Sequence, residues 1–299
     1  MQVWLLYIGD MEKFVIVTDS GASLTAEWRK QYNIILLPLA YIVNGESFSG
    51  ANVTDSETIE LYAKIRKKVV VSTASVNEDE ARTTCEKILA AGQDLLYVGF
   101  SSALSLSYET VVRVLEELKY KFPKRKILYI DTKAAAMGQG RLVIETAKLR
   151  DAGKTIEETH KWLTENILKS CHLFTVETLA YLFRGGRVKR GAYMMGTILQ
   201  IKPIMHVDDG GHLVAIGKVM GRKKSLDEIA TRVAKTIVEP ESQTIYINHG
   251  DCLLDAKYVA NKIAAKVKVA GFELSLLNTI IGAHSGPGTI TVFFAGTNR

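Results

Sequence analysis

The feature that most constrains the fold of this chain is the alternation of apolar, strand-like runs with helix-like segments through its first half. The following runs are predicted as strands: Phe14–Thr18, Ile34–Val43, Val69–Val71, Asp94–Phe100 and Lys126–Asp131. The segments that follow them are predicted as helices: Ser23–Tyr32, Thr54–Lys67, Asn77–Ala91, Ser105–Tyr120 and Thr132–Arg150. This strand–helix order is typical of a mostly parallel sheet with helices on both faces.

The second half of the chain mixes hairpin and strand–helix patterns. Thr155-x-x-Glu158 is a capping box that opens a helix to about Leu168. Asp208-Asp209-Gly210-Gly211 is a turn between the predicted strands Ile204–Val207 and His212–Ile216. Helices are then predicted at Ser225–Val238 and Leu254–Val269, and strands at Thr244–Asn248, Glu273–Thr279 and Thr289–Phe294. The mixture indicates an α+β fold.

The length of 299 residues favours two domains, because a single core rarely grows beyond about 250–300 residues. We expect an α/β domain at residues 11–153, an α+β domain at residues 154–299, and a ligand between them. Residues 1–10 are predicted to be an N-terminal extension, since Met11-Glu12-Lys13 before a strand is a more typical start. The apolar run Val3–Ile8 is far shorter than the ~20 residues that span a bilayer.

Charge and cysteine content narrow the function classes. The net charge of +6 comes without a nucleic-acid-binding motif, so it argues against nucleic acid and leaves room for transient contact with a membrane surface. Cys85, Cys171 and Cys252 are odd in number and widely spaced, which favours neither disulfides nor a zinc site and fits the reducing cytoplasm. The six histidines are scattered, and no metal site is expected.

Three polar clusters are predicted to lie in loops, at Ser72–Ser75, Ser101–Ser107 and Gly282–Gly288. The first two follow predicted strands, at the sheet edge where α/β proteins bind their ligands. Hydroxyls and helix N-termini together suit a carboxylate or a phosphate. Each cluster also has a structural interpretation, because such hydroxyls commonly cap helices, and glycines and a single histidine commonly serve turns and cores.

A serine esterase is one alternative. Gly99-Phe100-Ser101-Ser102-Ala103 half-matches the nucleophile elbow Gly-x-Ser-x-Gly, with Ala103 in place of the second glycine. Ser101 followed by a later acid and by His284 would have the required order. No phosphate-binding loop or dinucleotide fingerprint is present, and Asp19 after the first strand is more typical of a turn or cap.

Two basic stretches, Arg184–Arg190 and Lys218–Lys224, are either solvated surface or a docking face for an acidic partner or phosphate. Taken together, the motifs of this chain resemble those of the DegV family. They occur in the same order as in that family and cover the chain from about Met11 to the C-terminus. The resemblance rests on these segments: Val15–Ser20, Ser72–Ser75, Ser101–Ser105, Asp131-x-Lys133, Arg184–Arg187, Ile201–Ile204 and Ala283-His284-x-Gly286-x-Gly288.

The resemblance implies a two-domain fold with one long-chain fatty acid buried between the domains. In the FakB-like branch, the protein presents the acyl carboxylate to a separate fatty acid kinase, which makes acyl phosphate, and is not itself an enzyme. The same resemblance implies that Thr73, Ser105 and His284 surround the carboxylate. Ser72, Ser101 and Ser102 would form an additional ligand loop, and Arg187 and Arg222 would dock the kinase.

The chain departs from the family pattern at Ala74, Leu106 and Met220. Met220 stands where the family has a docking arginine, and Arg222 follows two residues later, so a regulatory lipid carrier without a kinase is a second alternative.

A buried carboxylate is costly unless it is hydrogen-bonded, and hydroxyls can donate to it without adding a charge. A tail of ~15 methylenes would contribute about 12 kcal/mol before ordering and association costs. Chain length and unsaturation stay open.

Overall fold

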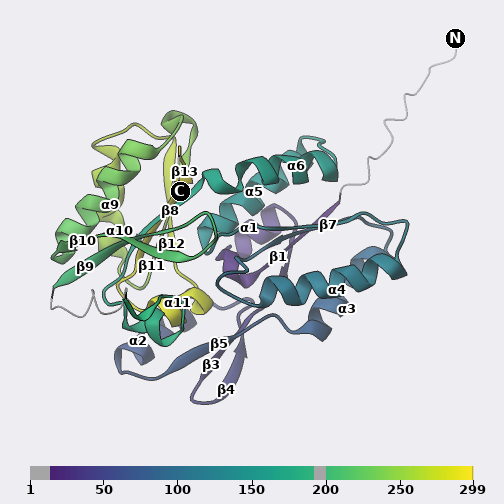
Figure 1. Cartoon of the computed structure of the whole chain (residues 1–299), viewed down its shortest axis with the longest axis horizontal. Helices are drawn as coiled ribbons and strands as arrows, with labels where there is room; N and C mark the ends of the chain where they lie inside the picture. Colours follow the sequence, from purple (N-terminus) through teal and green to yellow (C-terminus); the bar gives the residue numbers. More distant parts are fainter. Residues whose placement is uncertain (1–13, 192–199, 298) are drawn as a thin grey trace, which may run out of the picture.

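Three β-sheets organise the part of the chain that the structure describes (Figure 1). The computed structural model describes residues 14–191, 200–297 and 299, so the predicted extension at residues 1–10 lies outside the described residues. The predicted α/β class, with a parallel N-terminal sheet and a mixed C-terminal sheet, is confirmed.

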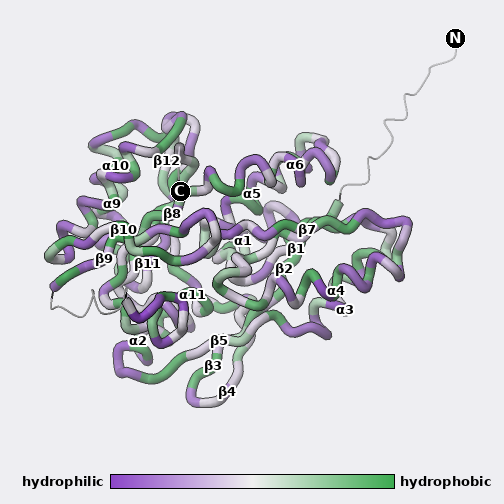
Figure 2. The backbone as a smooth tube through the Cα atoms, viewed as in Figure 1, coloured by the Kyte–Doolittle hydropathy of each residue, from purple (hydrophilic) through white to green (hydrophobic). Residues whose placement is uncertain are grey.

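The N-terminal sheet has the order β2-β1-β6-β7 and is parallel throughout. Its strands are β1 (Val15–Asp19), β2 (Ile34–Leu37), β6 (Leu95–Gly99) and β7 (Ile127–Asp131). Both faces are covered: α3 (Glu78–Ala90) and α4 (Ser107–Lys121) on one, α5 (Met137–Asp151) and α6 (Ile156–Asn166) on the other. In Figure 2, α3 and α4 alternate between purple and green, as expected for helices with one face in the core.

The C-terminal sheet has the order β10-β9-β8-β13-β11-β12, in which only β11 and β12 form a parallel pair. Its strands are β8 (Ser170–Thr175), β9 (Ile201–Val207), β10 (Leu213–Met220), β11 (Thr244–His249), β12 (Gly271–Leu276) and β13 (Ile290–Ala295). One face packs against α9 (Arg222–Thr236) and α10 (Leu253–Ala264). The other face meets α5, which also contacts β1 and β6 and therefore lies between the two large sheets.

The third sheet corrects two sequence predictions. The predicted strand Ile34–Val43 is divided at Pro38 into β2 and β3 (Ala40–Val43), because proline cannot donate to a ladder. Asn44 and Gly45, both with positive φ, then turn the chain into β4 (Glu46–Ser49), a hairpin that the Asn-Gly pair could have predicted. The strand expected at Val69–Val71 is β5 (Val71–Ala74), and it pairs antiparallel with β3.

Two further predictions place helix boundaries wrongly. The helix expected from Thr132 begins only at α5, because Lys133 and Ala136 adopt positive φ in the preceding loop. The glycine-rich segment at Gly282–Gly288, expected as a loop, begins in a helix, α11 (Thr279–Ser285), whose N-cap is Asn278. His284 therefore lies on a helix that packs against β5 and β3.

The remaining α-helices of the described residues are α1 (Ala26–Gln31), α2 (Asp55–Arg66) and α7 (Ala180–Arg184). The capping box predicted at Thr155 with Glu158 is present, and α2 begins with a second capping box at Thr54 with Glu57. Among the described helices, none is both long enough and apolar enough to cross a bilayer. The division of domains after residue 153 stays a prediction; α6, which follows it, packs against α5 and β7.

Candidate functional site

A cavity lies between the carboxyl-end loops of the parallel sheet and one face of the C-terminal sheet. Its empty volume is about 740 Å³, counting its opening to solvent. Most of its lining is apolar: Leu39, Phe100, Leu104, Ala135, Ala136, Phe174, Leu182, Val207, Leu213, Ile280, Ile281 and Phe293. Because these side chains come from loops of the N-terminal half, from strands of the C-terminal sheet and from α7 and α11, the tertiary fold creates the cavity.

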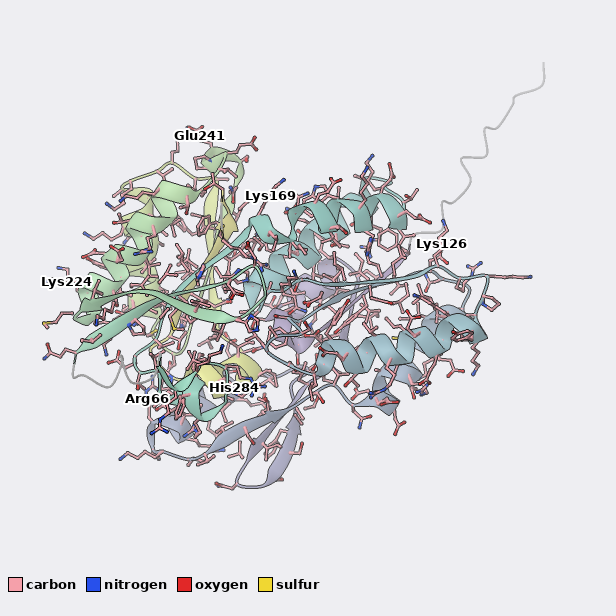
Figure 3. The ribbon with its side chains drawn as sticks, viewed as in Figure 1. Arg66, Lys126, Lys169, Lys224, Glu241 and His284 are labelled. Carbon is pink, nitrogen blue, oxygen red and sulfur yellow. The ribbon has the colours of Figure 1, made fainter. Side chains whose placement is uncertain are left out.

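Thr73, Ser105 and His284 all line this cavity. The Thr73 Oγ1 and His284 Nε2 atoms are 2.8 Å apart, which joins β5 to α11. The Ser105 hydroxyl lies 3.0 Å from the Ser107 hydroxyl, just before α4. Figure 3 shows His284 toward the middle of the molecule, whereas Lys224 and Glu241 lie at its edge. The fold therefore places the three residues that the resemblance assigned to the carboxylate in the lining of one cavity, with Thr73 and His284 in contact.

His284 is a neutral imidazole at neutral pH. Burial, and then the positive charges of Arg187 and Arg184, lower the pKa of His284 to about 4. Gly185 permits the ring to lie this deep, since a Cβ at that position would come within 2.2 Å of His284 Nδ1. The ring can thus donate or accept one hydrogen bond through Nε2, depending on its tautomer, without adding a charge of its own.

Arg187 also lines the cavity. Its Nε donates to the carbonyl oxygen of Leu104 at 3.0 Å, and a second guanidinium nitrogen donates to the carbonyl of Gly185. Burial lowers the pKa of Arg187, which at neutral pH still leaves it cationic. The half-buried side chain therefore sets a positive charge near the polar end of the cavity, and its predicted contact with a kinase stays a prediction.

The structure does not bring the other predicted residues into the cavity lining. Ser101 is fully buried and donates to the carbonyl of Gly211 at 3.0 Å, and none of the described histidines is its hydrogen-bond partner. The esterase hypothesis lacks the base that it requires. Ser102 donates to an Asp131 carboxylate oxygen at 2.6 Å. Ser72 is exposed on β5.

Arg222 lies away from the cavity lining, at the start of α9. Its guanidinium forms an ion pair with Asp255 on α10 at 2.7 Å and is partly buried there. The ion pair with Asp255 gives Arg222 a structural role, because it joins α9 to α10. Its predicted role in docking a kinase therefore stays a prediction.

Sequence reasoning missed four polar residues of the lining: His172, Ser285, Thr289 and Thr291. His172 lies on β8, a strand that was not predicted at all, although all six of its residues are buried. Thr291 alternates with buried Ile290 and Val292 along β13, and this period of two places it on the cavity face. Within the described chain, no three His, Cys, Asp or Glu side chains cluster in a way that could hold a metal ion.

Known proteins share the fold and much of the sequence. The family model described as "uncharacterised protein, DegV family" matches residues 13–297. A DegV domain-containing protein of Clostridium perfringens is 40% identical over 291 residues, which cover 97% of this chain and 99% of the relative. A DegV lipid-binding protein of Thermotoga maritima has a TM-score of 0.84 at 24% identity, covering 96% of this chain and 99% of its own. A second protein of that organism, described as revealing a fatty acid binding function, has a TM-score of 0.82 at 24% identity. The match covers 95% of this chain and 99% of that protein.

Proposed function

This chain belongs to the DegV family, and from that premise we propose that it binds one long-chain fatty acid in the cavity, with the carboxylate at Thr73, Ser105 and His284. One observation carries the proposal: the lining of a largely apolar cavity contains Thr73, Ser105 and a neutral His284, and Thr73 is hydrogen-bonded to His284. The structural relatives described above as lipid-binding and fatty-acid-binding proteins support the same ligand class.

The tail and the carboxylate of a fatty acid have different roles in its binding. Burying the tail supplies most of the affinity, at ~0.8 kcal/mol per methylene. The head group needs hydrogen bonds because a carboxylate in an apolar site is otherwise costly. Thr73 and Ser105 can donate hydroxyl protons, Arg187 in the lining adds a favourable charge, and α4 begins two residues after Ser105. The head group therefore fixes the orientation of the ligand.

We further propose that a separate fatty acid kinase phosphorylates the bound lipid in the cytoplasm. The carboxylate oxygen would attack the γ-phosphorus of the kinase's ATP, the new bond forming as the bond to ADP breaks. This chain would supply position and no reacting group. Adding a cognate kinase and ATP and measuring acyl phosphate tests the partnership. Lipid binding without acyl phosphate would favour the regulatory carrier instead.

Mass spectrometry of lipid extracted from the purified protein tests the ligand class. We expect about one long-chain fatty acid per chain. Ala135→Trp, which fills the cavity, should lose the lipid, whereas Ala152→Trp, beyond the exposed end of α5, should retain it. An extract without fatty acid, or equal lipid in both variants, would contradict the proposal.

A further inference from the structure

α11 places a second polar side chain in the cavity lining, Ser285, directly after His284. Ser285 is only 5% exposed, and its hydroxyl has no hydrogen-bond partner among the residues that the structure describes. Burial of a hydroxyl without a hydrogen bond is unfavourable, because the group loses its contacts with water and gains none in return. Ser285 therefore has a donor proton and an acceptor oxygen that the fold does not use.

The period of the helix places Ser285 on the cavity face of α11. Side chains four residues apart lie on the same face of a helix. Two such pairs line the cavity: Ile280 with His284, and Ile281 with Ser285. A Cβ at Gly282, between the two pairs, would instead meet the Tyr62 side chain of α2, which is outside the lining. The cavity face of α11 thus changes from apolar to polar toward its C-terminus, and Ser285 lies at the polar end.

The protons of Thr73, His284 and Ser105 are too few to satisfy a carboxylate. The contact between Thr73 Oγ1 and His284 Nε2 uses one proton, so this pair can offer at most one more to a ligand. The Ser105 hydroxyl lies against the Ser107 hydroxyl, which also accepts from the backbone N–H of Val76, and Ser105 can likewise offer one proton. Since a carboxylate has about four acceptor positions, roughly two of them stay open to further donors.

Thr289 explains how the C-terminus of α11 can lie near an anion. The last carbonyl groups of a helix carry partial negative charge, which disfavours a carboxylate close by. The Thr289 hydroxyl donates to two of the carbonyls at this end, those of Ser285 at 3.0 Å and Gly286 at 2.8 Å. The negative charge of the helix end is therefore reduced where the Ser285 side chain lines the cavity.

We propose that Ser285 is a further binding residue for the head group, and that its hydroxyl donates a hydrogen bond to a carboxylate oxygen of the bound fatty acid. The inference rests on the proposed function and deepens it by adding a donor to the head-group site. A hydroxyl suits this position because it donates without adding a charge to the lining. An ordered water is the competing partner, but only a carboxylate makes the effect of Ser285 depend on the charge of the ligand.

Competition of stearate and of methyl stearate against a fluorescent fatty acid tests the proposal. Ser285→Ala should weaken stearate about tenfold, the factor at the lower end of the range for one hydrogen bond to a charged group. The uncharged ester should weaken only about twofold. Thr279→Val is the matched control and should change neither affinity. Thr279 lies on the same helix, is 1% exposed and has an unpartnered hydroxyl, but it does not line the cavity.

Thermal unfolding of the ligand-free protein separates binding from a structural role. Because the Ser285 hydroxyl has no partner in the fold, Ser285→Ala should not lower the melting temperature. Unchanged stearate affinity, or an equal loss for acid and ester together with a lower melting temperature, would overturn the inference. If Ser285→Ala does not fold, Ser285→Cys, which has a weak donor, should show the same selective loss for the acid. Failure of the wild-type protein to bind stearate would count against the proposed function instead, so the two failures are distinguishable.

Discussion

Replacing Thr73 by valine tests the proposed carboxylate site most directly. Valine has nearly the shape of threonine and suits a strand, so β5 should keep its pairing with β3. The change removes the hydroxyl that lies 2.8 Å from His284 Nε2 and faces the cavity. Only the hydrogen-bonding capacity of the site is altered.

The expected loss follows from the charge of the ligand. A hydrogen bond to a charged group contributes about 1.5–3 kcal/mol. Because Thr73 is only partly buried, we expect Thr73→Val to lose about 2 kcal/mol of binding free energy, near the middle of this range. This loss corresponds to a roughly thirtyfold higher Kd for the fatty acid. Burial of the tail is worth about 12 kcal/mol before its costs, so the variant should still bind lipid.

The assay compares a fatty acid with its methyl ester by isothermal titration calorimetry. The ester carries no negative charge, so Thr73→Val should weaken it only about twofold. Ser72→Val, at the exposed neighbouring position on β5, is the control and should change neither affinity. An equal loss for acid and ester, or an equal effect of Ser72→Val, would refute the carboxylate assignment.

The remaining predictions concern pH, the esterase hypothesis and the C-terminal arginine. The folded pKa of His284 is about 4 and the unfolded value ~6.5, so the unfolded state binds more protons between these values. The melting temperature of the ligand-free protein should therefore fall as pH drops from ~6.5 to ~4; His284→Gln should flatten the curve, and an unchanged slope would contradict this. Ser101→Ala leaves the Gly211 carbonyl unpaired and should lower the free energy of unfolding in urea by about 1 kcal/mol, with fatty acid binding intact. If the wild-type protein hydrolyses esters and the Ser101→Ala variant does not, the esterase hypothesis would be supported after all. Arg299 donates to the carbonyls of Ser170, Lys133, Asp208, Thr132 and Ile167. Arg299→Ala should therefore cost about 3 kcal/mol in the same urea experiment; an unshifted unfolding midpoint would show that these bonds add little.

Local sequence patterns predicted the elements whose causes are local. The capping boxes at Thr54 and Thr155 act over three residues, and both helices begin as predicted. The strands β1 and β6 are buried throughout and largely apolar because helices cover both faces of a parallel sheet. β8 escaped prediction because Ser170, His172 and Thr175 make its sequence polar, although packing buries all three.

The sequence alone determined the family, the parallel N-terminal sheet and the three residue types proposed to hold a carboxylate. Only the tertiary structure decided what those residues meet. Thr73 and His284 are 211 positions apart, so their contact depends on how α11 packs against β5. Contacts between other remote segments bury His284 and make it neutral, commit the Ser101 hydroxyl to the carbonyl of Gly211, and place His172 in the cavity lining. Burial and distance between remote segments set the pKa values and hydrogen-bond partners, and local sequence patterns do not encode either quantity.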